Sequence, residues 1–135
     1  MKKSKIIFST ILIALLVGMS LSILSWMNIC TTACAEGHHY RIFGLRFEHI
    51  GLAFFSTAIF FHLLSLKNRF LKDILTYMVA GALGSEIMFI YAQKAIIGQW
   101  CPICLGIAAT IFIAFTAQMI EYYFENKLVE TRNTL

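Results

Sequence analysis

Four long apolar runs constrain the fold of this chain more than any other feature. They are Ile6–Trp26, His49–Leu66, Ile74–Gln93 and Cys101–Glu121. A helix needs roughly 20 residues to cross the hydrocarbon core of a bilayer, and each run is about that long. With 59% hydrophobic and only 13% charged residues, the chain is too apolar for a water-soluble domain of its size. The sequence therefore predicts an all-α integral membrane four-helix bundle, with residues 1–135 forming a single membrane domain.

The basic residues predict how the bundle is oriented in the membrane. Eight of the eleven lie before the first run, between the second and third, or after the fourth. These eight are Lys2, Lys3, Lys5, Lys67, Arg69, Lys72, Lys127 and Arg132, and the other three are Arg41, Arg46 and Lys94. By the positive-inside rule, both termini are cytoplasmic and the cysteine-bearing loops face outward. The net charge of +4 is then explained by topology, and we expect no nucleic acid partner.

The first apolar run has a second interpretation, as a cleaved secretory signal. Lysines precede it, and Ala33-Cys34-Ala35 resembles a small-residue cleavage site. However, Ile6–Leu24 is longer than the usual core of about 7–15 residues in a signal peptide. We therefore expect this run to be retained as the first span.

Two other segments have distinctive compositions. Residues 27–48 are polar and contain glycines, which predicts an outer loop that joins the first two spans. The third run contains Ala80, Gly81, Gly84 and Ser85. Small residues at this spacing allow helix backbones to approach closely, so we expect this stripe to pack against a neighbouring helix.

The motif Cys101-Pro-Ile-Cys104 opens the fourth run. Proline suits the first position of a helix, because the N–H that it lacks would have no helical partner there. Both cysteines then lie on one face at the helix start, where backbone N–H groups and the helix dipole favour the reactive thiolate. A structural disulfide across so short a loop would restrict the unfolded chain very little. The motif therefore favours redox chemistry over an inert disulfide.

A second pair, Cys30 and Cys34, lies in the predicted outer loop. Outside the cytoplasm, closely spaced thiols tend to form disulfides. Such a pair could accept electrons from a soluble dithiol and pass them to Cys101 and Cys104. The alternative is a zinc site, because the four cysteines together with His38 and His39 would supply enough ligands. We favour the redox interpretation and predict no metal site.

Taken together, these features resemble a known family. The residues that carry the resemblance are Cys30 and Cys34 after the first run, Phe43-Gly44-Leu45 leading to Ile50-Gly51-Leu52, and Trp100-Cys101-Pro102-Ile103-Cys104. They are similar to the vitamin K epoxide reductase family, in particular its small bacterial members. The resemblance covers roughly Ile6–Glu121.

This resemblance implies a membrane thiol-disulfide oxidoreductase in the bacterial inner membrane. In the family, a four-helix bundle surrounds a quinone, here ubiquinone or menaquinone, and electrons come from a thioredoxin-fold partner during disulfide formation. By position, Cys104 would touch the quinone, Cys101 would exchange with Cys34, and Cys30 would meet the partner. Only Tyr122–Leu135 follow the last run, so we expect the partner to be a separate protein.

Three further residues are candidates for contact with the quinone or the thiolates. Glu86 is the carboxylate deepest within an apolar run, and charged groups in a bilayer are costly unless they have a function or a partner. It could relay protons to the quinone, or it could be a neutral acid that bonds to a neighbouring helix. Arg41 and His49, near the outer loop, could stabilise a thiolate or a reduced quinone oxygen. From a different class, the chain could be a non-enzymatic membrane protein with structural disulfides or a zinc site.

Overall fold

The described residues form four long helices and one short hairpin. The computed structural model describes residues 2–27, 41–42, 44–96 and 98–133. The helices are α1 (Lys2–Trp26), α3 (Phe47–Ser65), α4 (Arg69–Ile96) and α5 (Pro102–Asn133). All four are long and apolar enough to cross a membrane, which confirms the predicted all-α integral membrane bundle.

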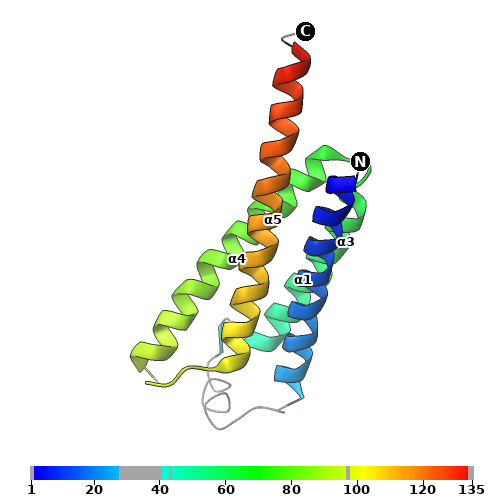
Figure 1. The fold of residues 1–135 in the computed structure, drawn as a ribbon. Helices are drawn as coiled ribbons and strands as arrows, with labels where there is room; N and C mark the ends of the chain where they lie inside the picture. Colours follow the sequence, from blue (N-terminus) through cyan, green and yellow to red (C-terminus); the bar gives the residue numbers. More distant parts are fainter. Residues whose placement is uncertain (1, 28–40, 43, 97, 134–135) are drawn as a thin grey trace.

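The helices extend beyond the predicted spans, most clearly for α4 and α5. Helix α4 starts at Arg69 because the side-chain oxygen of Asn68 accepts a hydrogen bond from the Phe70 N–H at 3.0 Å, which caps the helix N-terminus. Helix α5 continues to Asn133, well past the predicted end at Glu121, and projects beyond the other helices (Figure 1). Apolar content locates the segment that crosses the hydrocarbon, whereas a helix continues until a cap or a breaker ends it.

Each helix packs against two neighbours, so the bundle has a square arrangement. Helix α1 contacts α3 and α5, and α4 contacts the same two helices from the opposite corner. The start of α1, the connection between α3 and α4, and the end of α5 lie at one end of the bundle (Figure 1). Helix α5 begins at the other end, beside the end of α4. We call this second end the cysteine end, because Cys101 directly precedes α5.

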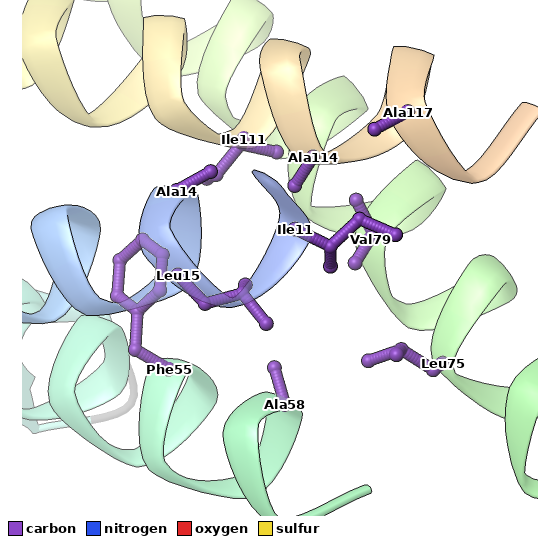
Figure 2. Packing of buried hydrophobic residues seen from close by; sticks show 10 residues of the cluster. All are labelled: Ile11, Ala14, Leu15, Phe55, Ala58, Leu75, Val79, Ile111, Ala114 and Ala117. Carbon is purple, nitrogen blue, oxygen red and sulfur yellow. The ribbon is translucent and has the colours of Figure 1, made fainter. Parts of the chain in front are cut away.

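The core lies where side chains of all four helices meet (Figure 2). Its buried hydrophobic residues are Ile11, Ala14, Leu15, Phe55, Ala58, Leu75, Val79, Ile111, Ala114 and Ala117. Four of these ten residues are alanines, whose small side chains allow the helix backbones to approach one another. Phe55 is the largest fully buried side chain and is 1% exposed.

Glycines allow the closest helix contacts, but not in the predicted stripe. A Cβ atom on Gly18 would collide with the ring of Phe55, and one on Gly51 would lie 3.1 Å from the side-chain oxygen of Ser22. By contrast, a Cβ on Gly81 or Gly84 would meet nothing within 4 Å. The expectation that the α4 stripe packs against a neighbour is therefore wrong for these two glycines. The close contacts are instead between α1 and α3, at Gly18 of α1 and Gly51 of α3.

The predicted outer loop contains a short hairpin that sequence reasoning missed. Strand β1 (Arg41–Ile42) pairs antiparallel with β2 (Leu45–Arg46), with Ile42 opposite Leu45. The turn passes through Gly44, whose φ of 80° is a conformation that glycine adopts without steric cost. Helix α3 follows directly at Phe47, so the hairpin is continuous with the helix.

Candidate redox site

Cys101 occupies the residue directly before α5. Its carbonyl oxygen accepts a hydrogen bond from the Leu105 N–H at 3.1 Å, which makes Cys101 the N-cap of the helix. Pro102 is the first helical residue, as predicted. The Cys101 side chain is only 4% exposed. The local sequence thus fixes a buried sulfur at the positive end of the helix dipole.

The two cysteines of the motif are in different chemical states. Cys101 is disulfide-bonded, whereas Cys104 keeps its thiol and is half-buried. The disulfide of Cys101 therefore does not involve Cys104. The predicted catalytic residues Cys30 and Cys34 lie outside the described residues. The motif cysteines are three positions apart in the sequence, so Cys104 lies about 4.5 Å further along the helix axis than Cys101.

Gln93 contacts the thiol of Cys104. Its side-chain nitrogen lies 3.5 Å from the sulfur and donates a hydrogen bond to it. Gln93 is 7% exposed and lies near the end of α4, which runs beside the start of α5 (Figure 1). Sequence reasoning treated Gln93 only as the boundary of a span. The sequence did contain a signal for this contact. Gln93 is a single amide at the end of the third apolar run, and the cysteine motif begins the next run.

The connection between α4 and α5 is held by local contacts. The Gly98 N–H donates a hydrogen bond to the Gln93 carbonyl at 3.2 Å, and its φ of 75° lets the chain leave the helix. The side-chain nitrogen of Lys94 donates to the Gly98 carbonyl at 3.3 Å and lies 5.6 Å from the centre of the Trp100 ring. These contacts place Gly98 and Trp100 beside the end of α4, between Gln93 and Cys101.

Glu86 lies deeper in the membrane span than Cys104. It precedes Gln93 by seven residues, or about 10 Å along the helix axis. It lines a cavity of about 280 Å³ between α3 and α4, together with Phe54, Phe55, Met78 and Ser85, and with Ile111 of α5. Cys104 does not line this cavity. The structure thus brings Gln93, rather than Glu86, to the sulfur.

The other predicted residues lie at the cysteine end but in different surroundings. His49 is exposed, and its ring meets the ring of Trp26 edge to face, with centroids 6.2 Å apart. Such a pair suits the membrane boundary. The backbone of Arg41 belongs to β1, opposite Arg46. Within the described residues, no group of three or more His, Cys, Asp or Glu side chains could hold a metal ion.

Comparison with known proteins adds one finding. The family model described as "Vitamin K epoxide reductase family" matches residues 5–119, which include α3, α4, the connection between α4 and α5, and Cys101 and Cys104. Comparisons with curated proteins and with solved structures give no significant match.

Proposed function

We propose that this chain, which belongs to the vitamin K epoxide reductase family, transfers electrons from an extracytoplasmic dithiol protein to a membrane quinone. Family membership and four apolar helices make it a multi-pass membrane protein of a redox family. The physiological result of the proposed transfer would be disulfide formation in the partner's substrates.

One observation carries the proposal: Cys101 is in a disulfide that excludes its motif partner Cys104. In an inert C-x-x-C disulfide, the two sulfurs would be bonded to each other. A bond from Cys101 to a different sulfur, with a Cys104 thiol in the next turn, is the state expected halfway through thiol-disulfide exchange. We propose that the other sulfur is Cys34.

The electrons would enter through the outer pair. A thioredoxin-fold partner with two thiols reduces the Cys30–Cys34 disulfide and is itself oxidised to a disulfide. The Cys34 thiolate then attacks Cys101 of a Cys101–Cys104 disulfide, which forms the Cys34–Cys101 bond and releases Cys104 as a thiolate. Attack of Cys30 on Cys34 restores the outer disulfide and releases Cys101. Two electrons have then moved from the partner to Cys101 and Cys104.

The inner pair would pass these electrons to the quinone. Cys101 and Cys104 return to a disulfide while the quinone takes up two electrons and two protons to become a quinol. Cys104 lies inside the membrane span, where an apolar acceptor is soluble. The hydrogen bond from Gln93 stabilises its thiolate. The apolar cavity lined by Phe54 and Met78 would accommodate part of the quinone, with Glu86 as a candidate proton donor.

The proposed location follows from charge. Basic residues gather at the end of the bundle opposite the cysteines, and by the positive-inside rule this end faces the cytoplasm. The cysteine end then faces outward, where an oxidised pair persists. In a bacterium this corresponds to the inner membrane. Arg41 and His49 lie at the same end and are candidates for stabilising a thiolate.

The proposal is tested with purified protein, a reduced thioredoxin-fold dithiol protein and a soluble quinone analogue. Wild-type protein should form quinol, and Cys104→Ala should lose this activity, because no sulfur remains to complete the inner disulfide. In the oxidised variant, before reduced partner is added, the Cys101 thiolate can attack Cys34 of the Cys30–Cys34 disulfide, which forms the Cys34–Cys101 bond and releases Cys30 as a thiol. Peptide mapping by mass spectrometry should then find Cys34 bonded to Cys101, because no Cys104 is present to displace Cys34.

Circular dichroism of Cys104→Ala confirms that the variant folds, and Cys101→Ala serves as the matched control for mapping, since it cannot form the trapped bond. Turnover of Cys104→Ala at the wild-type rate would rule out the proposed order of transfer.

A further inference from the structure

A second cavity, of about 480 Å³, lies at the end of the bundle away from the cysteines. Its walls come from the start of α1, the connection between α3 and α4, and the second half of α5. None of the residues assigned to the redox site lines it. The cavity therefore requires its own explanation.

Gln118 of α5 is the most informative residue in this cavity. It is 3% exposed, and neither its side-chain nitrogen nor its side-chain oxygen has a hydrogen-bond partner among the described residues. Burying an amide without partners is unfavourable. A hydroxyl group both donates and accepts hydrogen bonds, so a ligand with hydroxyls would satisfy both ends of this amide.

The charges around the cavity favour an anion. Lys72 is compensated, because its side-chain nitrogen lies 3.1 Å from a Glu121 oxygen and 2.7 Å from a Glu125 oxygen. Lys67 and Arg69 also line the cavity, are exposed, and have no ion-pair partner in the part of the chain that the structure describes. The lining thus has three basic and two acidic side chains, a net charge of +1, and its two basic groups outside the ion-pair cluster are the exposed ones.

The wall also has an apolar part, which includes Phe8, Ile11, Leu75, Leu128 and Val129. Phe8 lines the cavity beside Ile11. His62, which is 3% exposed, bonds to the Phe8 carbonyl at 3.0 Å and stacks on its ring at a centroid distance of 4.1 Å. Helix α3 ends at Ser65 and α4 begins at Arg69, so the cavity lies at the end of the spans. This is the level of lipid headgroups in a bilayer.

We propose that this cavity binds an anionic phospholipid whose headgroup carries free hydroxyls. The phosphate interacts with Lys67 and Arg69, and the headgroup hydroxyls bond to the Gln118 amide. The acyl chains lie along the apolar wall beside Phe8. Basic pockets between membrane helices bind anionic headgroups in this way, but the buried amide adds a requirement for hydroxyls.

The test compares three lipids in nanodiscs: phosphatidylglycerol, which is anionic with hydroxyls; phosphatidylmethanol, which is anionic without them; and phosphatidylcholine. Native mass spectrometry counts the lipids that the protein retains. Wild-type protein should retain phosphatidylglycerol best. Arg69→Gln should retain both anionic lipids about fivefold less, as expected for the loss of one charge near the surface. Gln118→Leu should keep both anionic lipids but lose the preference for phosphatidylglycerol.

Lys5→Gln is the matched control, because Lys5 is exposed at the same end of the bundle and does not line the cavity. A thermal melt adds an independent readout: phosphatidylglycerol should raise the Tm of wild-type protein but not that of Gln118→Leu, which should itself fold at least as stably in lipid-free detergent. Equal retention of all three lipids, or an equal loss in Lys5→Gln and Arg69→Gln, would overturn the proposal. Displacement of the lipid by soluble glycerol 3-phosphate would also overturn it, in favour of a free phosphate ester.

Discussion

Replacing Gln93 with Leu would isolate the contact between α4 and the sulfur of Cys104. Leucine has a similar volume and is apolar, so it fits a position that is 7% exposed without burying an unpaired polar group. The change removes the one hydrogen bond at 3.5 Å that Gln93 donates to Cys104. The bundle should therefore keep its stability while the thiolate of Cys104 loses a donor.

The expected magnitude follows from two opposing effects. A hydrogen bond to a charged group contributes about 1.5–3 kcal/mol, and we take about 1.5 kcal/mol because sulfur is a soft acceptor at a long distance. The thiolate fraction of Cys104 should then fall about tenfold at a pH where thiolate is the minor form. A less stabilised thiolate is also more nucleophilic. This second effect offsets about 0.4–0.5 of the free-energy change, so the activation free energy rises by only about half of it. The rate of attack should therefore fall by only about fourfold.

Two measurements on fully reduced protein separate these effects. Ultraviolet absorbance of the thiolate, in a Cys101→Ala background, reports the ionised fraction of Cys104 when the loop pair is blocked. Single-turnover quinol formation by stopped flow, with Cys101 present, reports the rate. Gln99→Leu is the matched control, since Gln99 is an exposed glutamine in the same connection. An unchanged thiolate fraction together with an unchanged rate in Gln93→Leu would refute the argument that Gln93 stabilises the thiolate.

Two further substitutions test the packing and the proton supply. Gly18→Ala should destabilise the bundle by about 1–3 kcal/mol, because the new Cβ would collide with the buried ring of Phe55 and lie 2.8 Å from the Thr110 hydroxyl. In thermal melts, the control Gly84→Ala should be neutral or stabilising. An equal loss of stability in both variants would contradict the close approach at Gly18. Glu86→Gln should slow quinol formation at least tenfold, because an amide cannot donate a proton as a carboxyl can. Unchanged turnover over a range of pH, in parallel with Ser85→Ala from the same cavity, would eliminate a relay through Glu86.

Local patterns in the sequence predicted the features that depend on nearby residues. The four spans followed from continuous apolar runs, and the start of α5 at Pro102 followed from the properties of proline. Helix ends were less predictable, because a cap such as the Asn68 side chain has no effect on hydropathy. The β1 and β2 strands have two residues each, which is too short for a periodic pattern.

Features that depend on how one helix faces another could not be predicted. Gly18 and Gly81 are both glycines within apolar runs, and the sequence does not distinguish them. In the structure, only a Cβ atom on Gly18 would collide with a side chain of a neighbouring helix. The contact between Gln93 and Cys104 likewise depends on the register of α4 against α5, which the turn at Gly98 sets. The state of Cys101 was open for the same reason, since three sulfurs were available to it.

The state of Cys101 has a consequence for how the proposed pathway is controlled. A sulfur can take part in only one disulfide at a time, so any bond from Cys101 to the outer loop leaves Cys104 as a thiol. The two sulfurs differ in depth by about 4.5 Å along one helix, and Cys104 is the one that lies inside the span beside Gln93. Exchange at Cys101 would therefore release Cys104 as the nucleophile that meets an apolar acceptor. No helix would have to move for this change. This coupling requires only that the loop sulfur and Cys104 compete for Cys101, so the share of Cys101 bonded to Cys34 should be larger in oxidised Cys104→Ala than in oxidised wild-type protein, and equal shares would contradict the competition.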